Sequence, residues 1–329
     1  LRLLKFYENY KNSFQFLILD SSSHEATKHI KYFLKKENID YKKYDSTIFF
    51  SDKISDGCKY IKTPFAVLCP DDDFLIPSSI IEAKNYLHAN LDYSSAHGIH
   101  FAHTQNSEIS KKGFSINPIY KFGNSSELDS SADRLKGYFM GKSGYYPMYA
   151  VHRTDLFKKI WTETKEYISD WGLSELFPCA LSFIYGKMKI LPLFYASREP
   201  NTFNWINKKR QKGMYNKEKT NRAIEGLTRH LSTFQNINLI DARKIVSKAF
   251  RHYLNNLDKK EKSQLNFKNS IFKKFKQKIR IRARLQSFFL KGCHISVYKK
   301  SFNDFSNVRE AVILSNIPDN VLNSSRKEY

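Results

Sequence analysis

The sequence predicts an α/β protein joined to a basic, mainly helical C-terminal region. In the first 205 residues, short apolar runs typical of buried parallel strands alternate with amphipathic stretches of helical period. Beyond residue 205 the strand patterns nearly vanish, and the chain becomes rich in Lys, Arg and Asn. We therefore expect one α/β domain over residues 1–205 and a basic helical region over residues 206–329.

The expected elements alternate in the order that builds a mostly parallel sheet flanked by helices. Each apolar run is followed by polar or capping residues, and Ser78 and Ser79 are candidate caps for a helix that follows Pro77. The carboxyl ends of parallel strands meet at one edge of a sheet, where we expect the functional residues. The expected strands cover residues 14–20, 64–69, 93–103 and 189–195, and the expected helices cover residues 24–37, about ten residues from 78, and residues 172–185.

Positive charge is concentrated in the second part of the chain. Residues 1–200 carry 26 basic and 23 acidic side chains, whereas residues 201–329 carry 29 and nine. Within residues 258–300, Phe272, Phe275 and Ile279 recur at helical spacing among 14 basic side chains. Such a helix suits an anionic membrane surface or the phosphates of a nucleic acid. It also suits packing of its apolar face on the first domain with its charges in water.

Cysteine content and hydropathy exclude two classes of protein. The four cysteines are far apart and form no C-x-x-C pair, which excludes a disulfide scaffold and a thiolate zinc site of ordinary spacing and indicates a reducing compartment. No apolar run approaches the roughly 20 residues of a membrane span. The chain begins with Leu and shows no signal peptide, so we expect that upstream residues have been removed.

Three consecutive aspartates, Asp71, Asp72 and Asp73, directly follow the expected strand at residues 64–69. Like charges this close are unfavourable unless a cation offsets them. Mg²⁺ or Mn²⁺ suits this position because such an ion binds one or two carboxylates and fills its other positions with phosphate oxygens and water. A solvated acidic turn is the alternative. The position between a strand and Phe74–Pro77 favours a cation that anchors a pyrophosphate.

These residues resemble a known family, the nucleotide-sugar-dependent glycosyltransferases of the GT-A fold, especially the bacterial family-2-like enzymes that build surface polysaccharides. The segment 68–77 is similar to their strand-borne DxD motif, and the segment 17–25 is similar to their earlier strand that ends in D-x-x-S. The resemblance implies that Asp71 with Asp72 or Asp73 holds a divalent ion and the donor diphosphate. It also implies that Asp20 contacts the nucleotide. Which two of the three aspartates face the metal stays open.

The same resemblance implies a catalytic base. Glu175 lies eleven residues before Gly186, ahead of a last strand, and inverting members place an acidic residue at about this position. Glu175 is therefore the first candidate for the base that deprotonates the acceptor hydroxyl, with Asp170 as its alternative. The competing interpretation of Glu175 is a charge on a helix surface.

Aromatic residues and histidines supply further candidates. The segment 138–157 suits an acceptor sugar, with Tyr145, Tyr146 and His152 as contacts, although core packing also explains such residues. His97 is expected near the donor sugar because its strand follows the acidic motif. Alternation along that strand places His97 and His103 on one face and His100 on the other, which argues against a three-histidine zinc site.

Together these features predict a metal-dependent, inverting glycosyltransferase. We expect it to move a sugar from a nucleotide-diphosphate donor, with a UDP-sugar favoured, to a glycan or lipid-linked acceptor. The expected location is the cytoplasm, with peripheral contact at the inner face of the membrane through residues 258–300. One departure is that the family begins with a β-strand that this chain lacks, which would leave a central sheet position empty. The alternative is a basic α/β protein that binds nucleic acid or a membrane surface without catalysis, which leaves the acidic cluster unexplained.

Overall fold

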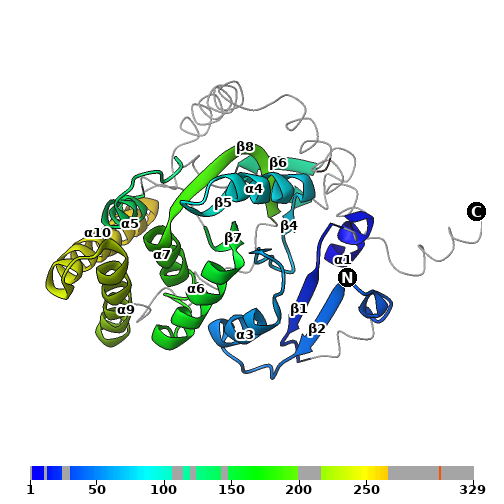
Figure 1. The fold of residues 1–329 in the computed structure, drawn as a ribbon, viewed down its shortest axis with the longest axis horizontal. Helices are drawn as coiled ribbons and strands as arrows, with labels where there is room; N and C mark the ends of the chain where they lie inside the picture. Colours follow the sequence, from blue (N-terminus) through cyan, green and yellow to red (C-terminus); the bar gives the residue numbers. More distant parts are fainter. Residues whose placement is uncertain are drawn as a thin grey trace, which may run out of the picture.

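A computed structural model describes most of the chain up to residue 265 (Figure 1). It shows a mixed α/β protein in which helices surround a curled sheet, so the predicted α/β class is confirmed, although most of the described strand pairs in the main sheet are antiparallel and not parallel as expected. The described residues are 2–10, 13–23, 30–105, 114–118, 124–141, 147–198 and 216–265, together with Asp304.

The main sheet has the strand order β3-β7-β5-β8-β4, with β6 paired to β5. β5 and β8 are parallel, and β7 is antiparallel to both β3 and β5. β3, β5 and β8 therefore run in the same direction, and their carboxyl ends meet at one edge of the sheet. The strands are β3 (Phe65–Ala66), β4 (Phe74–Leu75), β5 (Tyr93–Gln105), β6 (Phe114–Pro118), β7 (Val151–Arg153) and β8 (Lys187–Arg198).

A second, two-stranded sheet contains β1 (Phe16–Asp20) and β2 (Ile39–Lys43), which are parallel (Figure 1). No strand among the described residues joins it to the main sheet. Helix α1 (Arg2–Tyr7) contacts both sheets. The Tyr7 hydroxyl donates to the Leu75 carbonyl at 2.7 Å and accepts from its amide at 3.1 Å, and the Tyr7 ring lies 5.2 Å from the ring of Phe16 on β1.

Helices of both sequence regions share one hydrophobic core. Leu135, Leu181, Leu227, Val246 and Phe250 are fully buried in the same cluster. The two described helices of the basic region thus pack their apolar sides on the helices that precede them. The helices in this cluster are α5 (Ser131–Phe139), α6 (Thr154–Tyr167), α7 (Leu176–Tyr185), α9 (Lys217–Gln235) and α10 (Leu239–Leu265). None of the described helices combines the length and hydropathy needed to cross a membrane.

Helix α4 (Pro77–Ala89) begins where the sequence predicts, but the expected serine cap is wrong. Pro77 occupies the first helical position, so Ser78 and Ser79 lie inside the first turn, where the Ser79 hydroxyl donates to the Phe194 carbonyl. The Ser78 amide instead donates to Asp304 Oδ2 at 3.0 Å, while Asp304 Oδ1 accepts from Tyr10 at 2.9 Å. A carboxylate near the C-terminus of the chain thus stabilises this helix N-terminus.

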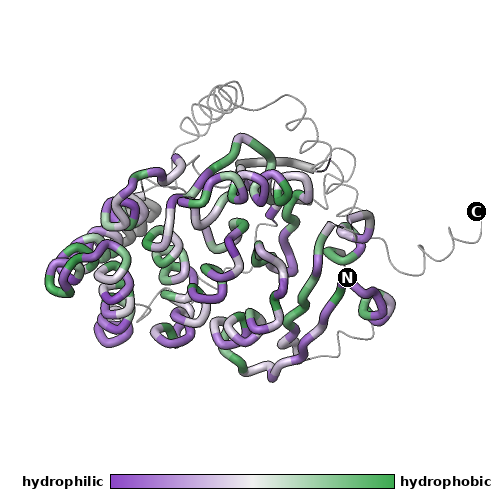
Figure 2. Tube along the Cα trace, in the orientation of Figure 1, coloured by the Kyte–Doolittle hydropathy of each residue, from purple (hydrophilic) through white to green (hydrophobic). Residues whose placement is uncertain are grey.

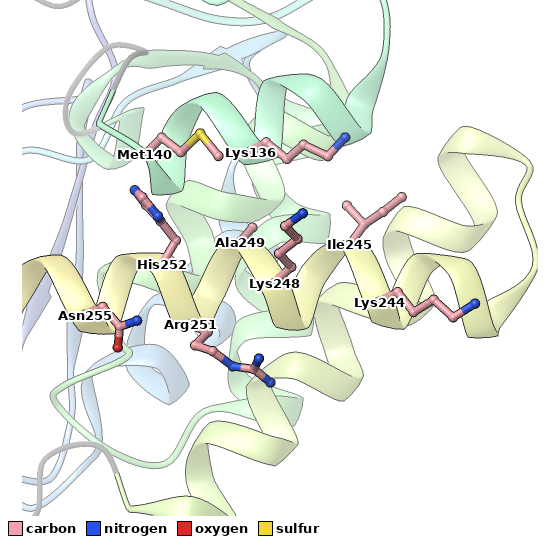
Figure 3. A pocket seen from close by; sticks show the side chains of 9 residues that line it. All are labelled: Lys136, Met140, Lys244, Ile245, Lys248, Ala249, Arg251, His252 and Asn255. Carbon is pink, nitrogen blue, oxygen red and sulfur yellow. The ribbon is translucent and has the colours of Figure 1, made fainter.

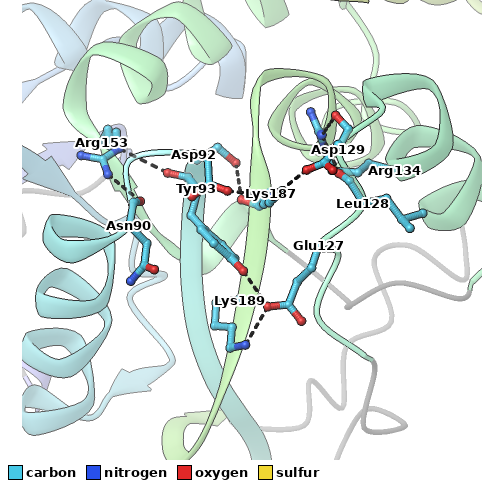
Figure 4. Close-up of polar contacts among 11 residues, drawn as sticks. Asn90, Asp92, Tyr93, Glu127, Leu128, Asp129, Arg134, Arg153, Lys187 and Lys189 are labelled. Atoms are coloured by element: carbon cyan, nitrogen blue, oxygen red, sulfur yellow. Dashed lines mark hydrogen bonds and ion pairs between the residues drawn. The ribbon is translucent and has the colours of Figure 1, made fainter.

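A polar network fixes the starting ends of β5 and β8 (Figure 4). Lys187 forms ion pairs with Asp92 at 2.8 Å and Asp129 at 2.7 Å. Glu127 accepts a hydrogen bond from Tyr93 at 2.6 Å and pairs with Lys189 at 2.7 Å. These contacts hold the two parallel strands in register at the edge opposite to their carboxyl ends.

Further along, β5 and β8 approach too closely for any side chain at Gly98. A Cβ atom at this position would lie 2.6 Å from the Leu193 carbonyl oxygen and 2.9 Å from Tyr195 Cβ. The contact involves backbone in the centre of the main sheet, which cannot yield without distorting the pairing.

Gly98→Ala is therefore expected to lower the free energy of unfolding by about 2–3 kcal/mol, measured by denaturant titration. Gly57→Ala is the matched control, because its Cβ would meet only the side-chain atoms of Leu19, the nearest being a terminal methyl at 2.5 Å. That flexible side chain can move, so the control should lose less than about 1 kcal/mol. Equal losses in the two variants would contradict the assigned role of Gly98.

Candidate functional site

Asp20 ends β1 with a carboxylate that is held ionised. Its Oδ1 accepts from the Ser22 amide at 2.8 Å, and its Oδ2 accepts from Tyr41 at 2.6 Å and Lys43 at 3.1 Å. Burial raises the pKa of this carboxyl, but hydrogen bonds from Tyr41, Ser22 and Lys43 outweigh it and bring the pKa well below its usual range. Asp20 is therefore a fixed anionic acceptor at the carboxyl end of the strand.

Lys53 connects this strand end to the acidic run. It lies on α3 (Phe50–Gly57), and its ammonium group donates to the Ser21 hydroxyl at 2.8 Å. Burial lowers the pKa of Lys53, whereas the negative charges of Asp71 and Asp20 raise it. One cation thus lies within the electrostatic reach of both predicted nucleotide-binding segments.

The acidic run divides into an inner and an outer part. Asp73 is buried with 2% of its surface exposed, and its Oδ2 accepts from Arg198 Nε at 2.6 Å. Arg198 ends β8, and its guanidinium lies 5.0 Å from the ring centroid of Tyr149. Asp71 is exposed and Asp72 is half-buried. The ion pair between Asp73 and Arg198 therefore ties the run to the carboxyl end of β8 and directs Asp71 to the surface.

The two candidate bases lie at the start of α7. Asp170 Oδ1 accepts from the amides of Gly172 at 2.9 Å and Leu173 at 3.1 Å, so this carboxylate stabilises the turn that leads into the helix. Glu175 is the half-buried residue immediately before the helix and makes no capping hydrogen bond with its side chain. The turn therefore engages the Asp170 carboxylate, and Glu175 lies one turn further along, at the start of the helix.

An exposed tryptophan beside these carboxylates was not recognised from the sequence. Trp171 is 54% exposed, and its ring lies 5.1 Å from Phe49 and 6.2 Å from Phe50. Both phenylalanines lie at the start of α3, the helix that carries Lys53. The sequence signal that could have indicated Trp171 is its position between the two candidate bases, Asp170 and Glu175. An exposed aromatic ring at such a place suits contact with the face of a sugar.

The expected alternation of the histidines is wrong for His97 and His100. The register of β5 against β8 is irregular on both sides of Ile99, where β8 carries the extra residues, and the two imidazole rings lie 5.1 Å apart. Both rings also contact Tyr195. Burial lowers the pKa of His97 to about 4 and that of His100 well below its usual value, so both are neutral at physiological pH. His97 is enclosed, with its Nδ1 2.6 Å from the Gly98 carbonyl.

The acceptor candidates are only partly described. His152 is buried on β7, where its Nε2 lies 2.6 Å from the Pro147 carbonyl, and burial lowers its pKa to about 4. Its ring packs against Phe157 at 5.7 Å. Tyr145 and Tyr146 lie outside the described residues. The side chains of the predicted basic segment 258–300 lie outside them as well.

No preformed metal cage exists in the part of the chain that the structure describes, since no three Asp, Glu, His or Cys side chains there come together. The negative charge of the acidic run is partly offset by Arg198 and Lys53. Asp71 and Asp72 lie at the surface end of the run, and two adjacent carboxylates fit an ion that takes its other ligands from a phosphate and water.

Comparison with known proteins adds little to this picture. No protein-family model and no curated protein matches the sequence. Among solved structures, the chain is similar to a crystal structure of S. aureus TarS at 11% identity and a TM-score of 0.40, covering 76% of this chain and 51% of that one. It is also similar to S. aureus TarS 1–349 at 11% identity and a TM-score of 0.41, covering 78% and 88%. The chain thus spans about half of the longer protein.

The inner and outer aspartates should differ in their effect on stability. Asp73→Asn removes the partner of the partly buried Arg198 and is expected to lower the free energy of unfolding by about 3 kcal/mol. Asp71→Asn, at an exposed position, should change it by less than about 0.5 kcal/mol. Denaturant titration of both variants measures the difference. A stable Asp73→Asn protein would show that the ion pair does not hold the run in place.

The lowered pKa of Asp20 predicts an acid-dependent contribution to stability. Because the folded-state pKa lies below the ordinary value of about 4, the contribution is fully present at neutral pH and is lost as pH falls below about 4. Tyr41→Phe removes one hydrogen bond to the carboxylate, so the pKa of Asp20 should rise, measured by NMR titration of the labelled carboxyl carbon. Tyr44→Phe, which affects Asp56 instead, should leave the titration of Asp20 unchanged.

Proposed function

We propose that this protein is a nucleotide-sugar-dependent glycosyltransferase. The observation that carries the proposal is Lys53 on α3, whose ammonium group donates to the Ser21 hydroxyl beside Asp20 and experiences the negative charges of both Asp20, which ends β1, and Asp71, which follows β3. Two carboxylates that act on one cation would provide acceptors for ribose hydroxyls and a donor for phosphate. This supports a shared donor site for the DxD-like segment and the D-x-x-S segment.

Each charged group then has a role in donor binding. Asp20, kept ionised by Tyr41 and Lys43, would accept hydrogen bonds from the ribose or the nucleobase. The ammonium of Lys53 would contact the diphosphate. A UDP-sugar is the favoured donor, and a glycan or lipid-linked saccharide the acceptor.

The metal site in this proposal is formed by the outer part of the acidic run. Asp71 and Asp72 would bind Mn²⁺ or Mg²⁺, and the remaining ligands would come from the diphosphate and water. Asp73 is a poorer ligand because Arg198 already engages it. When bound, the ion would supply charge neutralisation for the departing diphosphate.

Glu175 is the proposed general base. Glu175 is half-buried at the start of α7, directly after the turn in which Asp170 accepts two backbone hydrogen bonds. Glu175 would remove the proton of the acceptor hydroxyl while the hydroxyl oxygen displaces the diphosphate directly. Such a displacement would invert the configuration at the anomeric carbon. The exposed face of Trp171 would pack against a sugar ring next to this base.

Nucleotide binding tests the proposal. Calorimetric titration of the full chain with UDP should show binding that Mn²⁺ strengthens, and Asp71→Asn/Asp72→Asn should weaken it by at least about tenfold because both carboxylate ligands are lost. Asp155→Asn, at an exposed position on α6, is the matched control and should bind UDP like the original protein. Unchanged affinity in the double variant would contradict the proposed donor site.

Glu175→Gln should separate binding from chemistry. The substitution keeps the size and hydrogen-bonding capacity of the side chain but removes its basicity, so the affinity for UDP should be retained. Turnover of the UDP-sugar, measured as UDP release, should fall by about 10²–10⁴-fold. Retained turnover in Glu175→Gln together with loss in Asp170→Asn would move the base to Asp170.

A further inference from the structure

A groove of about 540 Å³ lies between α5 and α10, away from the candidate donor site (Figures 1 and 3). Figure 3 shows Ile245, Lys248 and His252 extending from α10 toward α5, which contributes Lys136 and Met140. α10 lies at the end of the molecule remote from β1 and β2. The groove therefore belongs to a surface that the proposed transferase chemistry does not use.

The groove is strongly cationic. Lys136, Lys244, Lys248 and Arg251 line it, and no acidic side chain is among its described lining residues. Lys136 and Lys244 each have an acidic neighbour on their own helix, at 3.0 and 3.3 Å. Within the described part of the chain, no ion pair involves Lys248 or Arg251. These two cations are available for an anionic partner.

The same surface carries exposed apolar side chains. Leu239 and Ile240 at the start of α10 are 57% and 70% exposed, and Phe234 near the end of α9 is 40% exposed. The tube coloured by hydropathy shows this apolar tip where α9 turns into α10 (Figure 2). Ile240 lies one turn before Lys244, so apolar and cationic side chains follow one another along one face of α10.

We propose that the groove and the apolar tip of the α9–α10 hairpin form a docking surface for an anionic phospholipid membrane. Lipid phosphates would bind Lys248 and Arg251 in the groove, and Leu239 and Ile240 would enter the boundary between headgroups and acyl chains. The surface differs from the basic segment at residues 258–300, and it does not depend on the proposed transferase activity.

Charge complementarity and apolar exposure together favour lipid over nucleic acid. Exposed Leu and Ile side chains gain free energy by leaving water for an apolar phase, which a phosphate backbone does not offer. No Phe, Tyr or Trp is found among the described residues that line the groove, so it lacks the ring platforms on which nucleic-acid bases stack. A lipid surface uses both features of this face.

Vesicle sedimentation of the full chain tests the proposal. The protein should bind vesicles of phosphatidylcholine mixed with phosphatidylglycerol and should not bind phosphatidylcholine alone. Lys248→Gln/Arg251→Gln should weaken binding about 25-fold, because each cation near an anionic surface contributes roughly fivefold. Lys31→Gln/Lys62→Gln removes the same charge from two exposed positions outside the surface and should leave binding unchanged. Equal weakening in both double variants would overturn the proposal.

A second variant tests the apolar tip. Leu239→Ser/Ile240→Ser alters two exposed side chains, so the fold should be retained, and binding to the mixed vesicles should weaken roughly tenfold. UDP binding should be unaffected in all of these variants, which separates this test from that of the transferase site.

Three other outcomes would overturn the proposal. Vesicle binding that is unchanged in Lys248→Gln/Arg251→Gln would show that the groove does not contact the membrane. Competition by millimolar inorganic phosphate would indicate a site for soluble phosphate. Binding of the protein to immobilised duplex DNA is the third outcome. If Lys248→Gln/Arg251→Gln lost this binding and Leu239→Ser/Ile240→Ser kept it, the two cations would be assigned to nucleic acid.

Discussion

The ion pair between Asp73 and Arg198 is the contact on which the candidate site depends. It joins the segment after β3 to the carboxyl end of β8, two parts of the chain separated by more than a hundred residues in sequence. With Asp73 anchored inward, the neighbouring aspartates are left at the surface, where Asp71 lies in the field of Lys53. An acidic run that would otherwise be a solvated turn is thereby fixed at the carboxyl end of β8. The pair is also partly buried, so its loss would affect both stability and the geometry of the site.

Local sequence patterns predicted the elements whose signal lies within a single segment. The apolar runs of β1, β5 and β8 and the helical periods of α4 and α7 were found close to their actual positions. Features that depend on distant partners could not be predicted. Nothing in the sequence near Asp73 indicates Arg198, and nothing near Ser78 indicates that Asp304 accepts from its amide. The irregular register around Ile99 likewise depends on pairing with β8, so strand alternation alone placed His97 and His100 on opposite faces.

The separation into two sheets constrains the site in a different way. β1 and β2 do not pair with the main sheet, so the distance between Asp20 and Asp71 depends on α1 and α3 rather than on a hydrogen-bonded strand ladder. Tyr7 fixes α1 to Leu75, and Lys53 on α3 contacts the residue after Asp20. Side-chain contacts of this kind are easier to rearrange than a ladder of backbone hydrogen bonds. We therefore expect the donor site to be the part of the molecule whose geometry responds most to a bound nucleotide.

Core packing and the proposed membrane contact use different faces of α10. Val246 and Phe250 on α10, with Leu227 on α9, complete the core that α5 and α7 begin, so these two helices are part of the folded body. The opposite face of α10 carries the cations of the groove. A helix that is held on one side by its core contacts can present charges on the other side without first having to fold on its partner. Packing against the first region and binding an anionic surface are thus not competing explanations for α10, because each uses a different face of the same helix.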